Sequence, residues 1–120
     1  MVTYGLIDID DFTTYNQING FEKGNDILVK FLELGENILK PKIWTKFGSD
    51  EYLFVINGSF NDNNSSILEL FKRNEDFLNI TISIGVSEQI VDVEIREVIN
   101  LLKVNLLTDK AHGKKKICVT

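Results

Sequence analysis

The sequence VTYGLIDIDDF, residues 2–12, joins an apolar run to three acidic side chains. Residues 2–9 are rich in β-branched and aliphatic side chains, a composition typical of a β-strand. Asp8, Asp10 and Asp11 therefore gather where that strand ends. Carboxylates grouped at a strand end are candidates for chemistry, although turns that face water carry acids too.

A second stretch, GSDEYLFVI at residues 48–56, has the reverse order, because its two acids precede the apolar run. Residues 51–56 are predicted to form another strand. Gly48-Ser49 favours a two-residue hairpin turn of type II′, which takes Gly at its first central position. If the two predicted strands are antiparallel neighbours, the end of one meets the start of the other, about 5 Å away.

That adjacency would set Asp8 beside Asp50 and Glu51. Three carboxylates so close repel one another unless they hold a cation. Hard oxygen ligands with room left for a substrate suit Mg²⁺ or Mn²⁺. We therefore expect these acids to bind a divalent metal ion, and strand-end acids that face water are the alternative.

Hydrophobic periodicity predicts helices and strands along the whole chain. The expected elements are strand 2–9, short helix 12–18, helix 25–39, strand 43–47, strand 51–56, helix 65–75, strand 79–86, helix 93–108 and strand 115–119. The polar segment 57–66 is expected to be a loop. This order is a split β-α-β plan, a ferredoxin-like α+β fold with an antiparallel sheet, helices mainly on one face, and the first strand at the centre.

The composition fits one globular domain, residues 1–120, with 43% hydrophobic and 10% aromatic residues. A net charge of −5 argues against a broad nucleic-acid surface, whereas a nucleotide needs only a local positive patch. The single cysteine, Cys118, cannot form an internal disulfide, which fits a reducing cytoplasm. Nothing in the sequence looks like a signal peptide, a membrane span or an attached sensor domain.

Several motifs resemble those of GGDEF domains, the cyclases that make cyclic di-GMP. The residues similar to the first motif of these domains are Asp8-Ile9-Asp10-Asp11-Phe12, Asn16, Gly20, Gly24-Asn25 and Leu28. Gly48-Ser49-Asp50-Glu51-Tyr52 resembles the signature that names the family, residues 80–86 its later strand, and residues 110–114 its closing helix-to-strand turn. The same catalytic palm occurs in type III CRISPR complexes and in a stand-alone minimal CRISPR polymerase, which this chain also resembles.

The resemblance implies a phosphoryl transfer, in which a ribose hydroxyl attacks the α-phosphate of a nucleoside triphosphate and pyrophosphate leaves. It implies that Asp8, the backbone carbonyl of Ile9, and Asp50 bind Mg²⁺ or Mn²⁺. Glu51 would be a further ligand or would remove the hydroxyl proton, so Asp8, Asp50 and Glu51 are the expected catalytic residues. Asp10 either joins them or caps the following helix.

The resemblance also implies a nucleotide site. Backbone N–H groups at the start of the short helix would face the triphosphate, and the loop bracketed by Gly20 and Gly24 would seat the base. Two lysines would contact phosphates, although the basic run 114–116 can equally be a solvated surface. The expected nucleotide-binding residues are Asp11, Phe12, Asn16, Asn25, Gly48, Ser49, Lys110 and Lys114.

Asn25 stands where cyclic di-GMP synthases usually carry aspartate. An aspartate only accepts hydrogen bonds and complements the donors of guanine, whereas an asparagine amide has one donor and one acceptor group and can pair with adenine. The alternative is that Asn25 caps the helix 25–39. Thr13 replaces a family lysine, and Ser49 replaces a glycine beside the nucleotide.

We therefore predict a nucleotidyltransferase that condenses two nucleoside triphosphates, with ATP favoured, into a cyclic dinucleotide for anti-phage signalling. A two-fold homodimer would bring two half-sites together, and a separate effector would bind the product. One alternative is a diguanylate cyclase that makes cyclic di-GMP from GTP. Another is a degenerate domain that binds a nucleotide without catalysis, as Thr13 and Ser49 suggest.

Overall fold

β1 (Val2–Ile9) runs through the middle of a five-stranded sheet with strand order β2-β3-β1-β4-β5. The computed structural model describes residues 1–48, 50–89, 94–111 and 117–119. The further elements are α1 (Phe12–Asn19), α2 (Phe21–Leu39), β2 (Ile43–Lys46), β3 (Glu51–Asn57), α3 (Phe60–Leu78), β4 (Ile82–Gln89), α4 (Ile95–Ala111) and β5 (Ile117–Val119). The predicted α+β class, element order and central first strand are confirmed.

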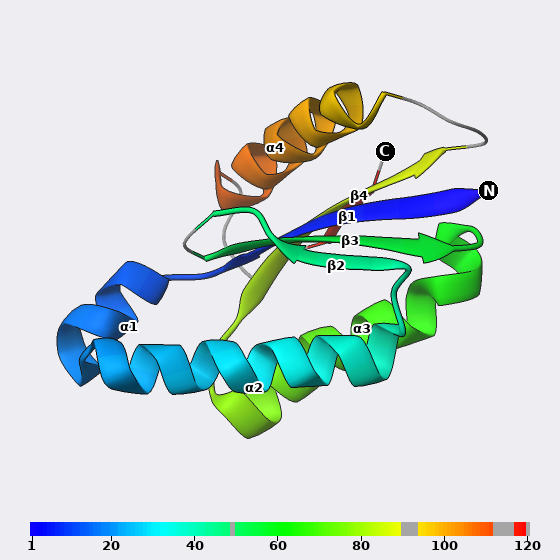
Figure 1. Ribbon diagram of the computed structural model, residues 1–120. Helices are drawn as coiled ribbons and strands as arrows, with labels where there is room; N and C mark the ends of the chain where they lie inside the picture. The colour runs from blue at the N-terminus through cyan, green and yellow to red at the C-terminus, as the bar shows by residue number, and fades with distance from the viewer. Residues whose placement is uncertain (49, 90–93, 112–116, 120) are drawn as a thin grey trace.

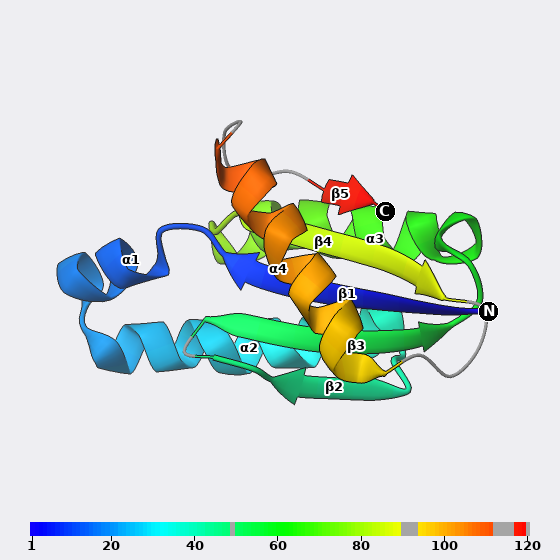
Figure 2. The same ribbon diagram turned by 90° about the horizontal axis from the view of Figure 1, so that it is seen from above.

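Three of the four strand pairings are antiparallel, and the short edge strand β5 pairs parallel to β4. The helices α2 and α3 lie along one face of the sheet, and α4 crosses the opposite face (Figures 1 and 2). Because side chains of a strand alternate between faces, β1 contributes to two cores. Ile7 and Ile9 pack on the side of α2 and α3, whereas Leu6 packs against α4.

The helix α3 begins earlier than predicted. The segment 57–66 does not form the expected loop, because α3 starts at Phe60 and the predicted boundaries 65–75 are too short at both ends. Ser59 Oγ accepts a hydrogen bond from the Asp62 N–H at 3.1 Å, and the Asp62 carboxylate accepts one from the Ser59 N–H at 3.1 Å. This reciprocal capping box satisfies two N–H groups at the start of the helix and so stabilises it in a polar sequence.

The helix α2 also begins earlier, at Phe21 instead of residue 25. Gly20 alone separates it from α1, with a positive φ of 90° that glycine adopts without strain. Gly24 lies inside the helix and lets α1 approach, because a Cβ there would overlap the Asn16 side-chain oxygen. The prediction that Asn25 caps the helix is therefore wrong.

The hairpin between β2 and β3 differs from the predicted turn. The Phe47 N–H donates to the Glu51 carbonyl at 2.7 Å, so strand-like pairing continues beyond Lys46 and leaves more than two residues in the connection. Gly48 does not adopt the positive φ that a type II′ turn requires at its first central residue. Ser49 lies outside the described residues.

We predict that Ser59→Ala lowers the free energy of unfolding by about 1 kcal/mol, because it removes the capping hydrogen bond of α3. Urea unfolding followed by circular dichroism would measure the change. Ser65→Ala, at an exposed position inside the same helix, is the control and should leave stability within about 0.5 kcal/mol. Equal stability of the Ser59 variant and wild type would contradict the assigned start of α3.

Candidate functional site

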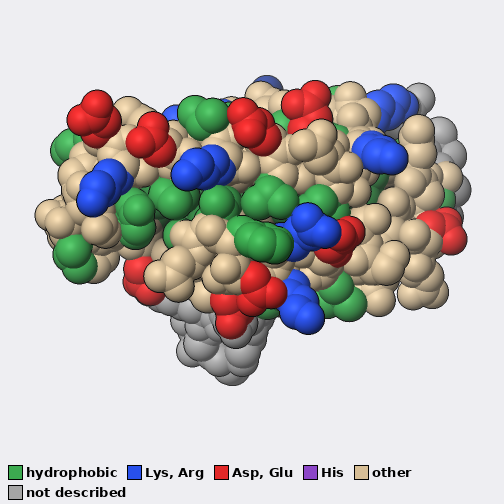
Figure 3. Space-filling view, turned by 90° about the horizontal axis from the view of Figure 1, so that it is seen from below, with side chains coloured by type: hydrophobic (Ala, Val, Ile, Leu, Met, Phe, Trp, Pro, Cys, Tyr) green, Lys and Arg blue, Asp and Glu red, His purple; other side chains and the backbone are tan. Residues whose placement is uncertain are grey.

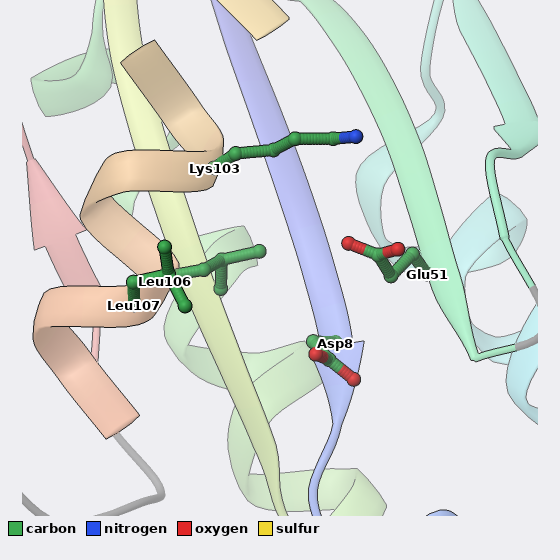
Figure 4. A pocket seen from close by; sticks show the side chains of 5 residues that line it. All are labelled: Asp8, Glu51, Lys103, Leu106 and Leu107. Carbon is green, nitrogen blue, oxygen red and sulfur yellow. The ribbon is translucent and has the colours of Figure 1, made fainter. Parts of the chain in front are cut away.

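Asp8 and Glu51 lie directly opposite each other on the neighbouring strands β1 and β3. Both carboxylates are half-buried and line a pocket of about 190 Å³, together with Lys103, Leu106 and Leu107 of α4 (Figure 4). We call this the carboxylate pocket. The predicted meeting of Asp8 with the acids of the second motif is thus confirmed for Glu51.

Asp50 is not among the described residues that line the carboxylate pocket. Its carbonyl accepts a hydrogen bond from the Ile9 N–H at 3.1 Å, which extends the β1–β3 pairing by one residue. Burial first and the negative charge of Asp50 second raise the pKa of Tyr52, whose ring packs against Phe31 of α2. Asp50 therefore acts electrostatically on a residue of the core beneath α2, while Glu51 faces the pocket.

Asp10 joins the end of β1 to β4. Its carboxylate accepts hydrogen bonds from Thr81 Oγ1 at 2.8 Å and from Ser83 Oγ at 2.7 Å, and its N–H donates to the Thr81 carbonyl. The residue at the N-cap of α1 is Asp11, with a left-handed φ of 56° and no side-chain cap. The prediction that Asp10 caps this helix is wrong, because the hydroxyls of Thr81, just before β4, and Ser83, within β4, donate to its carboxylate instead.

A second pocket of about 350 Å³ lies between α1, α2 and the hairpin, and we call it the helix pocket. It brings together three of the residues expected to bind a nucleotide, namely Phe12, Asn16 and Asn25. Phe21 and Lys46 line it as well, and the sequence analysis did not single them out. The sequence gives no signal for Phe21, because its exposure at the start of α2 is seen only in the structure.

The hairpin forms a wall of both pockets. Lys46 lines the helix pocket, and the next residue, Phe47, contacts the Lys103 ammonium of the carboxylate pocket with its ring at 5.1 Å. The end of β1 links the pockets on the other side, because Asp8 lines one and Phe12 the other. The hairpin and the end of β1 thus contribute residues to both pockets.

The remaining predicted site residues do not line these two pockets among the described residues, and Ile9 and Asp11 line a separate pocket beside the start of α1. Ile9 ends β1, Gly48 precedes Asp50 in the hairpin, and Asp11 is exposed at the start of α1. Lys110 lies in α4. Ser49 and Lys114 fall outside the described residues, so their predicted roles stay predictions.

The donor set of the carboxylate pocket fits a divalent cation. Like charges on directly opposite residues of neighbouring strands weaken a sheet, and a divalent cation held by Asp8 and Glu51 would offset that cost. Carboxylate and carbonyl oxygens are the ligands that hard divalent ions take. Within residues 1–48, 50–89, 94–111 and 117–119 no group of three or more acids, His or Cys is arranged to hold one ion, so the described donor set is the pair Asp8 and Glu51.

A wider groove of about 400 Å³ lies on the outer face of the two helices α2 and α3, far from the carboxylates. Hydrophobic side chains form a band across this face, bordered by lysines, arginines and acids (Figure 3). Its lining is mainly apolar, with Leu34, Ile38 and Phe77 beside Lys30 and Arg73. No helix in the described part of the chain is long and apolar enough to cross a membrane.

No protein-family model and no curated protein matches the sequence. Solved structures do match the fold. The active GGEEF domain of a diguanylate cyclase from Vibrio cholerae is 21% identical, with a TM-score of 0.86 over 98% of this chain and 81% of that one. The diguanylate cyclase SiaD from Pseudomonas aeruginosa, solved with its activator SiaC, is 20% identical with a TM-score of 0.90, and this chain spans half of its length.

The GGDEF domain of DgcB from Caulobacter crescentus, solved in complex with c-di-GMP, is 15% identical. Its TM-score is 0.87, over 98% of this chain and 77% of that one. The chain therefore has the fold of GGDEF domains, as its motifs predicted.

Proposed function

We propose that this chain is a metal-dependent nucleotide cyclase that joins two nucleoside triphosphates into a cyclic dinucleotide and releases pyrophosphate. The observation that carries the proposal is the facing pair Asp8 and Glu51 in a pocket at the end of β1. A pure structural role does not explain this pair, since like charges directly opposite each other weaken a sheet. The fold shared with diguanylate cyclases supports the same chemistry.

The substrate would lie along the hairpin. Its base would occupy the helix pocket, where Phe12 offers an apolar wall and two asparagine amides offer hydrogen bonds. Its phosphates would then run past Phe47 into the carboxylate pocket. Because Asp8 and Phe12 are close in sequence, the same short segment would contact both the phosphates and the base of the substrate.

Asp8 and Glu51 would hold the divalent cation, Mg²⁺ or Mn²⁺, with the Ile9 carbonyl and Asp50 as further proposed ligands. When bound, the cation supplies Lewis-acid activation of the hydroxyl and neutralises phosphate charge. The ribose hydroxyl oxygen attacks the α-phosphorus, the bond from that phosphorus to the pyrophosphate oxygen breaks, and Glu51 accepts the hydroxyl proton. Asp10 keeps the end of β1 fixed through the hydrogen bonds that its carboxylate accepts from Thr81 and Ser83.

Ring closure requires two nucleotides that face each other, and one chain offers one set of pockets. We therefore propose a two-fold homodimer as the active form. The cyclic product would then act as a second messenger through a separate effector, for which anti-phage signalling is our proposal.

Asn25 favours ATP as the substrate. It lies exposed on α2 at the wall of the helix pocket, and because it does not cap the helix its amide remains available to a base. An amide that has one donor and one acceptor complements adenine, which presents a ring nitrogen and an amino group side by side. GTP is the alternative substrate, supported by the diguanylate cyclases with the same fold.

We predict that the purified protein with Mg²⁺ or Mn²⁺ forms a cyclic dinucleotide, identified by mass spectrometry after incubation with each triphosphate singly and in mixtures. Asp8→Asn and Glu51→Gln should each lower the rate by at least roughly 100-fold, because they remove a metal ligand or the proton acceptor. Asp76→Asn, at an exposed position of α3, is the matched control and should keep full activity. Unchanged rates in both pocket variants would refute the assigned roles.

We predict that Mn²⁺ raises the melting temperature of the wild-type protein and that Asp8→Asn removes this shift. In EDTA the same variant should melt higher than wild type, because the repulsion between Asp8 and Glu51 is gone. Differential scanning fluorimetry would measure both effects without any nucleotide. An Asp8→Asn protein that retains the full Mn²⁺ shift would show that the ion binds elsewhere.

We predict that Asn25→Asp shifts the preference from ATP toward GTP by about 10-fold or more in the ratio of kcat/KM values, because an acceptor-only side chain complements guanine donors. Asn37→Asp, an equal charge change at an exposed position of the same helix, should leave the ratio unchanged. An unchanged ratio in Asn25→Asp would mean that another residue selects the base.

A further inference from the structure

We propose that Lys103 binds phosphate oxygens of the triphosphate in the carboxylate pocket, a role that rests on the proposed function. No motif of the sequence pointed to this residue. It belongs to α4, on the face of the sheet opposite to α2, and only the packing of α4 across the sheet brings it to the acids.

The Lys103 side chain extends from α4 across β1 toward Glu51 and lines the pocket with both carboxylates (Figure 4). Among the described residues, Lys103 forms no salt bridge with Asp8 or Glu51. The ammonium lies instead over the Phe47 ring, 5.1 Å from its centre. A cation–π contact of this kind orients a lysine and leaves its N–H donors open to an anion.

The negative charge of the carboxylate pocket explains why a nucleotide would need the Lys103 ammonium. Asp8 and Glu51 repel the phosphates of an incoming nucleotide, and the whole chain carries a net charge of −5. A divalent ion between the carboxylates offsets part of that repulsion, and an ammonium on the opposite wall adds attraction for the phosphate chain. Leu106 and Leu107 line the same wall, which lowers the local polarity and strengthens the contact.

The geometry also assigns a role to Phe47. Its ring belongs to the hairpin between the two pockets and holds the Lys103 ammonium beside the proposed path of the phosphates. Phe47 is therefore a positioning residue that acts through Lys103. Its own side chain is partly exposed, with 40% of its surface accessible, which suits a contact made at the entrance of a pocket.

A different role for Lys103 would be that of a permanent counter-ion for the two carboxylates. The two roles predict different effects of Lys103→Met on polyphosphate and metal affinity. This substitution roughly keeps the length of the side chain and removes its charge. A phosphate-binding lysine is needed for polyphosphate affinity. A counter-ion competes with the metal, so its loss would tighten metal binding and leave polyphosphate affinity unchanged.

Isothermal titration calorimetry of the whole protein in saturating Mg²⁺, with inorganic tripolyphosphate as the ligand, tests the proposal. We expect Lys103→Met to weaken tripolyphosphate binding by about 10-fold or more and Lys103→Arg to stay within about 3-fold of wild type. Phe47→Leu should give an intermediate loss. The control variant is Lys72→Met, at an exposed position of α3, which should bind tripolyphosphate as tightly as wild type. The control ligands are adenosine and guanosine, which lack phosphates and should bind every variant equally.

In turnover assays Lys103→Met should raise KM for the triphosphate, whereas Lys103→Arg should have a KM close to that of the wild-type protein. Wild-type affinity of Lys103→Met for tripolyphosphate would overturn the proposal, and so would tighter Mn²⁺ binding alone. If Lys103→Met fails to fold, the comparison of Lys103→Arg and Phe47→Leu with wild type decides. If the wild-type protein binds tripolyphosphate through Lys103 but makes no product, only the proposed cyclase activity is refuted. If Lys103→Met keeps full turnover and an unchanged KM, only the proposed role of Lys103 is refuted.

Discussion

The antiparallel register of β1 and β3 is the constraint on which the site depends. The register pairs Leu6 with Leu53 and Ile7 with Tyr52, and all four side chains are buried. A slip of one residue would turn every side chain of β1 to the opposite face and so disrupt the packing of both cores, which the fold cannot tolerate. The same register sets Asp8 opposite Glu51. Burial of hydrophobic pairs in the middle of the strands thus fixes, at their ends, a pairing of acids that would not form by itself.

The strands and the acid pair could be predicted because their signals are local. The apolar runs at β1 and β3 leave few other structures open, and the predicted split β-α-β plan makes the two strands neighbours. The starts of α2 and α3 could not be predicted from the sequence in the same way. Gly24 looked like a loop residue, yet it serves close packing against Asn16, and Ser59 with Asp62 caps a helix whose first turns are polar. In both cases a tertiary or capping contact outweighs the low helix propensity of the sequence.

The residues of the candidate site also fall into two groups, those that the sequence predicted and those that it did not. The motifs predicted Asp8, Glu51, Phe12, Asn16 and Asn25, and the structure places these five residues at two pockets. The capping role predicted for Asp10 is wrong because its hydrogen-bond partners, Thr81 just before β4 and Ser83 within it, lie far along the chain. Lys103 could not be found at all, since a lone lysine in an amphipathic helix is ordinarily a solvated residue. Contacts between distant elements carry this information, and short sequence patterns do not contain it.

The position of the acid pair also accounts for how the fold tolerates it. At the middle of the sheet two opposed carboxylates would disrupt the core, because buried charges without compensation cost several kcal/mol each. At the end of β1 the pair is half-buried and opens into a pocket that an ion or a phosphate can enter. Asp10, one alternation further, is bound by two hydroxyls and anchors the strand end that the repulsion would loosen. The two acids thus lie where a ligand could enter, and a cation bound there would also stabilise the adjoining strand ends.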